Sequence, residues 1–231
     1  MNKIIFLSML MLFGCQFQKT QLGLSNNIAA DLSQVSPKQT SLLISANGIG
    51  NAKLGMTLRQ LKQMSPANTE FNYIAPFSAE LNAIAVVEQG LVQYYILYKT
   101  DDDAKSAEFT PQDSDVITAL MTSNYNYQTE EGIKVGTPIQ EAEDIYGNAI
   151  LAYNVDGESG EYITFGDYSS DNIRFRASYF KLISDGLGFA GIYPEYPGVA
   201  YTTEKYNADA AIAAIEVSCP EDDCLQIGSS H

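Results

Sequence analysis

The sequence predicts an α+β protein of two tandem repeats, each a short capped helix packed on a roughly four-stranded antiparallel sheet. A glycine-flanked lead-in occurs twice before a helical apolar pattern, and strand-like apolar runs follow each helix. The third observation is that an apolar run and then a polar stretch precede the first repeat, which sets the N-terminal residues apart from the folded body. We therefore expect five segments, namely 1–14, 15–40, 41–124, 125–220 and 221–231.

Residues 1–14 have the pattern of a removable export signal. Lys3 gives a positive start, and the apolar run at 4–13 is too short for a membrane-spanning helix, which needs about 20 apolar residues. The following Leu12-Phe13-Gly14-Cys15 resembles the lipobox of bacterial lipoproteins, in which a Cys after a small residue is acylated and becomes the new N-terminus. The resemblance implies that Cys15 is the lipid attachment site. The alternative is an ordinary secretory signal with an incidental Cys.

The residues after Cys15 bear on location. Asp directly after the acylated Cys often retains such lipoproteins in the inner membrane, and this chain has Gln16 instead. The resemblance therefore implies an outer-membrane, periplasm-facing lipoprotein, with an inner-membrane or cell-surface lipoprotein as the alternatives. Two lipid attachments on one Cys would anchor it stably to the bilayer. Segment 15–40 is polar and lacks apolar periodicity, which predicts a flexible tether.

The two helix starts predict similar caps. Thr57 with Gln60, and Thr137 with Gln140, each have the spacing of a capping box. Pro138 fits the first position of the second helix, where its missing N–H does no harm. Aligning Gly55 on Gly136 gives each helix one apolar stripe, which pairs Leu58 with Ile139, Leu61 with Ala142 and Met64 with Ile145.

Strand-like runs follow each predicted helix. In the first repeat they lie at 81–88 and 91–98, joined by a Gln89-Gly90 turn, with a closing strand at 115–121. In the second they lie at 149–155, 162–165 and 173–179, with a closing strand at 211–217. The long connections at 99–112 and 181–209 are predicted to be loops.

The capped-helix lead-in resembles the repeat of small exported α+β proteins. These are the outer-membrane assembly lipoproteins of the SmpA/OmlA type and the β-lactamase-inhibitor protein, and the body is similar to uncharacterised bacterial lipoproteins. The resemblance rests on the segments 48–61 and 131–142. It implies an architecture and no catalytic residues.

Charge and composition exclude several functions. The chain has 13 Lys and Arg against 28 Asp and Glu, and loss of Lys3 with the signal makes the mature protein still more acidic. Nucleic-acid binders need a basic surface, so we expect no nucleic-acid partner. Segment 50–57 has Met56 where a phosphate-binding loop needs Lys, so we expect no nucleotide. We predict no cofactor.

The sequence also gives little support for catalysis. The only His is the terminal His231, which argues against His-dependent hydrolysis and zinc sites. Glu158 with Glu161, and Glu141 with Asp144, keep a carboxylate-dependent hydrolase open as an alternative. With 28 acids in the chain such pairs arise by chance, so we assign no catalytic residue and no metal ligand.

The remaining cysteines are Cys219 and Cys224. An exported protein meets an oxidising compartment, so this short interval predicts a structural disulfide. A redox-active pair, which usually has the tighter C-x-x-C spacing, and two free thiols are the alternatives.

The loop at 181–209 is the predicted partner surface. It is rich in Gly and Pro and contains Tyr193, Tyr196 and Tyr201, and tyrosine is a common anchor of protein interfaces. We therefore expect a membrane-anchored exported lipoprotein that acts as a protein-binding or scaffold module of the cell envelope. The alternative function is a protein inhibitor of an exported enzyme, which rests only on the resemblance in architecture.

Overall fold

The computed structural model describes residues 42–78, 80–100, 109–154, 160–178, 189–194 and 200–220. The chain divides into two units, Met1–Lys38 and Gln39–His231, and all described residues belong to the second. Among these residues, no helix is long and apolar enough to cross a membrane. The predicted signal peptide, Cys15, the whole tether at 15–40 and the C-terminal tail at 221–231 lie outside the described residues.

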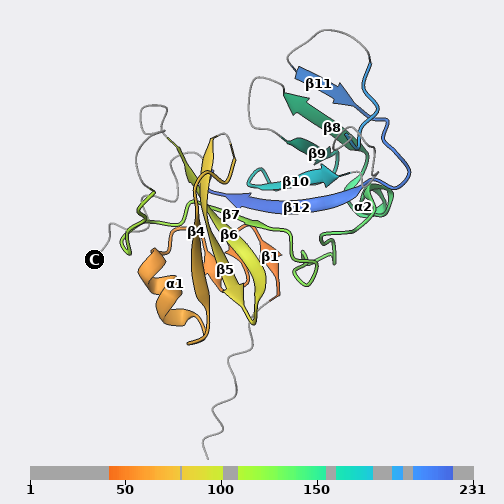
Figure 1. The fold of residues 1–231 in the computed structure, drawn as a ribbon. Helices are drawn as coiled ribbons and strands as arrows, with labels where there is room; N and C mark the ends of the chain where they lie inside the picture. Colours follow the sequence, from red (N-terminus) through yellow and green to blue (C-terminus); the bar gives the residue numbers. More distant parts are fainter. Residues whose placement is uncertain are drawn as a thin grey trace, which may run out of the picture. The chain divides into compact units, whose positions relative to one another are not determined.

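The described elements are mostly short strands (Figure 1). The two helices are α1 (Leu58–Met64) and α2 (Ile139–Tyr146). The strands are β1 (Ile44–Ser45), β2 (Gly48–Ile49), β3 (Ala52–Lys53), β4 (Glu70–Ile74), β5 (Leu81–Glu88), β6 (Leu91–Lys99), β7 (Ala119–Thr122), β8 (Ala149–Asn154), β9 (Glu161–Phe165), β10 (Ile173–Ser178), β11 (Ala200–Thr203) and β12 (Ala211–Ser218).

The prediction of two tandem repeats, each with its own four-stranded sheet, is wrong. Strands from both halves form one antiparallel nine-stranded sheet in the order β11-β8-β9-β10-β12-β7-β6-β5-β4, and β1-β2-β3 form a separate sheet. The predicted closing strands, β7 and β12, pair with each other, with Thr122 opposite Ile215 and Leu120 opposite Val217. Separate sheets would leave both strands with unpaired backbone groups, whereas this pairing satisfies them.

Most predicted strands in the central part of the sheet are present. β5 has the predicted bounds, and β6 follows it through a two-residue turn in which Gln89 and Gly90 have φ of 53° and 78°. Positive φ at both positions is the requirement of a type I′ hairpin turn. Three features were missed: the small β1-β2-β3 sheet and the two edge strands, β4 and β11. β11 lies inside the segment predicted as a long loop.

Only the first predicted capping box is confirmed. The Gln60 N–H donates to Thr57 Oγ1 at 3.3 Å, and the Thr57 N–H donates to Gln60 Oε1 at 2.8 Å. At α2 the N-cap is Pro138, which makes no side-chain cap. Thr137 lies one residue too early, and its hydroxyl instead accepts the Lys134 N–H at 3.1 Å.

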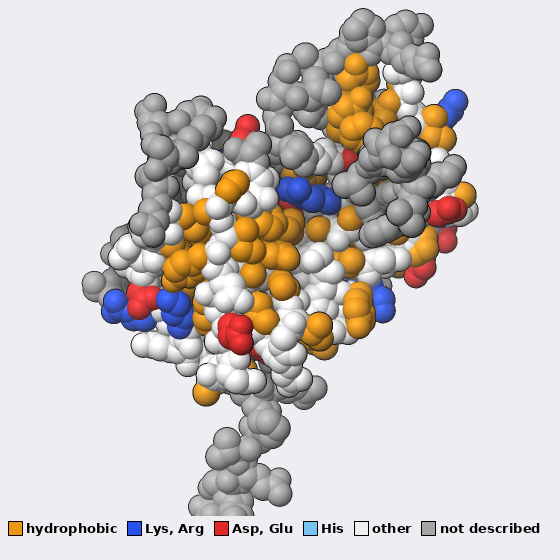
Figure 2. All heavy atoms as spheres, viewed as in Figure 1, with side chains coloured by type: hydrophobic (Ala, Val, Ile, Leu, Met, Phe, Trp, Pro, Cys, Tyr) orange, Lys and Arg blue, Asp and Glu red, His pale blue; other side chains and the backbone are white. Residues whose placement is uncertain are grey.

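The main core lies between the large sheet and the elements that cover one of its faces. Leu58 and Leu61 of α1, and Ile139 and Ala142 of α2, are fully buried there. The third predicted pair of the stripe, Met64 and Ile145, is exposed, so the buried stripe of each helix is shorter than predicted. A smaller cluster on the sheet consists of Leu81, Ala83, Leu97, Met121 and Ala214. Figure 2 shows hydrophobic side chains gathered over β5 and β6, with basic side chains beside them.

Candidate functional site

Four aromatic rings gather beside the edge strand β11. Tyr153 on β8 lies opposite Tyr201 on β11, and the two rings stack with centroids 4.8 Å apart and an interplanar angle of 10°. Phe189 stacks on Tyr153 at 4.1 Å, and Tyr193 meets Tyr153 edge-on at 4.7 Å. We call these four residues the aromatic cluster. Such stacked and edge-on contacts are the favoured arrangements of aromatic side chains.

The structure brings together two of the three tyrosines predicted to form a partner surface. The rings of Tyr193 and Tyr201 are 6.3 Å apart. Tyr196 lies outside the described residues. The sequence did not point to Tyr153, because its contact with Tyr201 depends on the pairing of β8 with β11. It also did not single out Phe189, which lies in the same predicted loop as the tyrosines.

The buried carboxylate of Glu161 fixes the segment that carries Phe189 and Tyr193. Glu161 lies on β9 and accepts the N–H groups of Ala190 at 2.6 Å and Gly191 at 2.7 Å, and the hydroxyl of Tyr193 at 2.6 Å. Burial raises the pKa of Tyr193, and donation to Glu161 adds to the shift. The backbone of Gly191 approaches Glu161 so closely that a Cβ at this position would lie 2.8 Å from a Glu161 carboxylate oxygen.

An open cavity of about 780 Å³ adjoins this segment. It is lined by Ile150, Ile192, Tyr193, Pro194, Thr202 and Thr203, together with Glu204 and Lys205. The Thr203 hydroxyl donates to the Ile192 carbonyl at 2.9 Å and so joins β11 to the 189–194 segment. Ile150, Phe189 and Ile192 are all exposed. The ring of the exposed Phe189 contacts that of Tyr193, which lines the cavity, with centroids 5.8 Å apart. We call this cavity and Phe189 the β11-edge surface.

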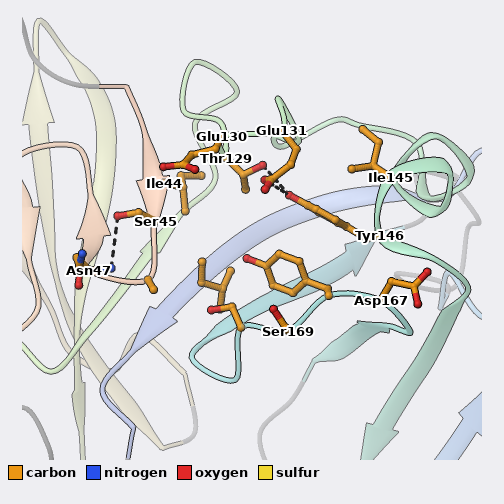
Figure 3. A pocket seen from close by; sticks show the side chains of 14 residues that line it. Ile44, Ser45, Asn47, Thr129, Glu130, Glu131, Ile145, Tyr146, Asp167 and Ser169 are labelled. Atoms are coloured by element: carbon orange, nitrogen blue, oxygen red, sulfur yellow. Dashed lines mark hydrogen bonds between the residues drawn. The ribbon is translucent and has the colours of Figure 1, made fainter.

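A second cavity, of about 540 Å³, lies beside α2 (Figure 3). The Tyr146 hydroxyl of α2 donates its proton to Glu131 Oε2 at 2.7 Å. It therefore accepts a hydrogen bond from the Thr129 hydroxyl, which lies 2.7 Å away. Figure 3 shows Thr129 and Glu131 directed toward the Tyr146 hydroxyl from one side, with Asp167 and Ser169 away from it. The Tyr168 ring packs on Tyr146, with centroids 4.5 Å apart.

In this hydrogen-bond network the Tyr146 hydroxyl stays protonated and is hydrogen-bonded to both Glu131 and Thr129. Burial raises the pKa of Tyr146, and the bond that it donates lowers the pKa of Glu131. The hydroxyl is therefore unsuited to act as a base or nucleophile at neutral pH. We assign the network a structural role, in which it joins α2 to the 129–131 turn.

The carboxylates considered for catalysis do not meet in a cleft among the described residues. Glu161 holds the loop, and Glu141 and Asp144 are exposed on α2. Glu158 and the terminal His231 lie outside the described residues. Within the described ranges, no group of three or more His, Cys, Asp or Glu side chains is placed to hold a metal ion.

Cys219, which follows β12, is disulfide-bonded. Its predicted partner Cys224 lies outside the described residues, so the pairing stays a prediction. The Cys219 N–H donates to the Thr118 carbonyl at 2.7 Å and extends the pairing of β12 with the β7 segment.

Comparisons with known proteins give one structural likeness. No protein-family model matches the chain, and no curated protein matches it. The structure is similar to the crystal structure of the uncharacterized protein yfeY from Escherichia coli, with 16% sequence identity and a TM-score of 0.41. The match covers 76% of this chain and 99% of that chain.

Proposed function

We propose that this protein is a lipoprotein of the bacterial cell envelope, anchored through Cys15, that binds a protein partner at the β11-edge surface. The observation that carries the proposal is the aromatic cluster, in which Phe189 is exposed and Tyr193 lines an open cavity with two exposed isoleucines. The anchoring rests on the export signal and the lipobox resemblance at residues 1–15.

The chemistry of the β11-edge surface favours a protein as the ligand. Clustered apolar side chains on a surface commonly mark an interaction site, and aromatic residues are the usual anchors of such sites. β11 is an edge strand of the described sheet, and edge strands are common places for an extended segment of a partner to bind. Glu204 and Lys205 add charged groups that can orient the partner.

Glu161 supports the proposal because it holds the surface in place before any partner binds. Its three hydrogen bonds add to the two backbone hydrogen bonds that join this segment to residues 205–207, from the Ile192 N–H to the Lys205 carbonyl and from the Asn207 N–H to the Ala190 carbonyl. A pre-ordered surface binds without the entropic cost of ordering a loop. We therefore expect Glu161 to affect binding without touching the partner.

The test is site-specific photo-crosslinking of the full chain in cells. A photoreactive residue at Ile192 is expected to form a discrete adduct with one protein. The same residue at Ile145, a similarly exposed isoleucine on α2, is the matched control and is expected to form none. The Ile192 adduct should weaken strongly with Glu161→Gln. Equal crosslinking at both positions, or none at Ile192, would contradict the proposed partner surface.

Anchoring is tested separately by acylation. Metabolic labelling with an alkyne-tagged fatty acid should label the wild-type chain and not Cys15→Ser. The variant should leave the membrane fraction, provided that export continues. An unlabelled wild-type chain would contradict the lipoprotein assignment while leaving the crosslinking result interpretable.

A further inference from the structure

A second group of exposed apolar side chains lies away from β11. Leu91 and Tyr125 are 60% and 66% exposed, and Leu42 and Leu43 are 47% and 36% exposed. Leu91 begins β6 directly after the Gln89-Gly90 turn, and Leu42 is the first described residue. We call these four residues the hairpin-end patch.

Hydrogen bonds join the turn that carries Tyr125 to the start of β6. The amide of Asn124 donates to the Val92 carbonyl at 3.1 Å, and the Thr122 hydroxyl donates to the Gln93 carbonyl at 2.7 Å. The turn that carries Tyr125 therefore lies against the first residues of β6.

The same turn contacts the start of the folded body. The Gln128 N–H donates to the Leu42 carbonyl at 3.0 Å, and the Ile44 N–H donates to the Gln128 carbonyl at 2.7 Å. The hydroxyl of Tyr127 donates to the Gln93 side chain at 3.4 Å. Leu42, Leu43, Tyr125 and Leu91 thus belong to segments that are bonded to one another in series.

We infer that the hairpin-end patch rests on the surface of the bilayer that holds the lipid anchor. This inference builds on the proposed anchoring through Cys15, because the chain that joins Cys15 to the body enters at Leu42, within the patch. A flexible tether of this length, which the sequence predicts, spans an r.m.s. distance of about 30 Å. The patch is therefore held close to the bilayer at a high effective concentration.

Weak apolar contacts suffice under these conditions. The anchor already supplies the free energy that keeps the protein at the membrane, so the patch needs only to favour one orientation. Leucine side chains bury well in an interface, and tyrosine is enriched where hydrocarbon meets water.

Charge favours a neutral lipid surface as the partner. Glu88 lies opposite Leu91 in the hairpin, and the whole chain carries a net charge of −15. Both features oppose binding to anionic headgroups, so the contact is apolar and should change little with salt. In the sheet, β8, β9, β10, β12 and β7 separate β11 from β6, which leaves the β11-edge surface available to a protein.

The chain contains no Trp, so a single introduced Trp reports its own position. We would place Leu91→Trp, Tyr125→Trp and the matched control Ile192→Trp in the acylated full-length protein. Each would be reconstituted in phosphatidylcholine vesicles with and without brominated lipid. Quenching by brominated lipid should be several-fold stronger at 91 and 125 than at 192, at low and high salt. Adding Leu91→Asp to Tyr125→Trp should reduce its quenching toward the control.

The outcomes separate this inference from the proposed anchoring. Protein that floats with the vesicles but shows equal quenching at 91, 125 and 192 overturns the bilayer contact and leaves the anchoring intact. Protein that does not float overturns both. Strong quenching only with anionic lipid and low salt would replace the apolar contact with an electrostatic one and so also overturn the inference.

Discussion

The two halves of the large sheet bury tyrosine in different ways. In the half formed by β4 to β7, burial raises the pKa of Tyr94 and Tyr98, and the buried Tyr98 hydroxyl has no hydrogen-bond partner among the described residues. In the other half, three tyrosine hydroxyls donate to glutamates, as Tyr146 does to Glu131, Tyr193 to Glu161 and Tyr206 to Glu143.

The difference follows from the kinds of chain segment that each half of the sheet contains. The first half consists largely of long paired strands, whose backbone groups satisfy one another and whose side chains pack as an apolar core. The second half also holds segments that lack a continuous ladder, such as 189–194 and 129–131. Such segments need side-chain acceptors, and a carboxylate is the strongest available. The surface proposed to bind a partner therefore depends on charge-assisted hydrogen bonds, whereas the first half depends on packing.

The largest effect is expected from a cavity in the first half. Ile84 is fully buried on β5, and Ile84→Ala should lower the free energy of unfolding by about 2–5 kcal/mol. Because β7 and β12 join the halves into one sheet, both halves should unfold in one transition in urea. Asn72→Ala, at an exposed position on β4, is the control and should change little. Two separate transitions would argue that the halves are independent.

A smaller and more local effect is expected at Glu161. Glu161→Gln replaces one acceptor oxygen with an NH₂ group that faces a donor, at a cost of about 1–3 kcal/mol. Hydrogen exchange should accelerate at the amides of Ala190 and Gly191 and remain unchanged in β5. The surface change Glu204→Gln is the control. Acceleration spread evenly over the sheet would show that Glu161 does not act locally.

The Tyr146–Glu131 bond should appear in the pH dependence of stability. The pKa of Glu131 is lowered in the folded state, so its contribution is present above the unfolded pKa and is lost as pH falls through the folded pKa. Tyr146→Phe removes the bond at a cost of about 1 kcal/mol at neutral pH. It should also reduce the acid-dependent loss, measured by urea unfolding from pH 7 to about pH 3. An NMR titration should show the Glu131 pKa rising in the variant; an unchanged value would contradict this account.

The sequence predicted the central strands well and the sheet's assembly poorly. β5 and β12 are eight-residue strands made mostly of apolar residues, a signal that a single sequence displays. β11 is four residues long and half exposed, so it resembles a loop in sequence. The pairing of β7 with β12 joins segments far apart in the chain, and nothing local specifies it.

The candidate site shows the same limit. Tyr193 and Tyr201 were predicted from their place in a Gly- and Pro-rich segment. Tyr153 joins them only because it lies opposite Tyr201 once β8 pairs with β11. Glu161 was considered as half of a catalytic pair, since sequence alone does not reveal that two backbone N–H groups approach its carboxylate.

The smallest effect distinguishes the two helix starts, which look alike in sequence. Gln60 accepts the Thr57 N–H, whereas the structure gives Gln140 no capping role. Gln60→Ala should therefore cost about 0.5 kcal/mol, the low end of a lost hydrogen bond. Gln140→Ala should cost nothing or stabilise slightly, because Ala is the better helix former. Urea unfolding of the two variants gives a matched comparison, and an equal loss at both positions would mean that α2 has a capping box after all.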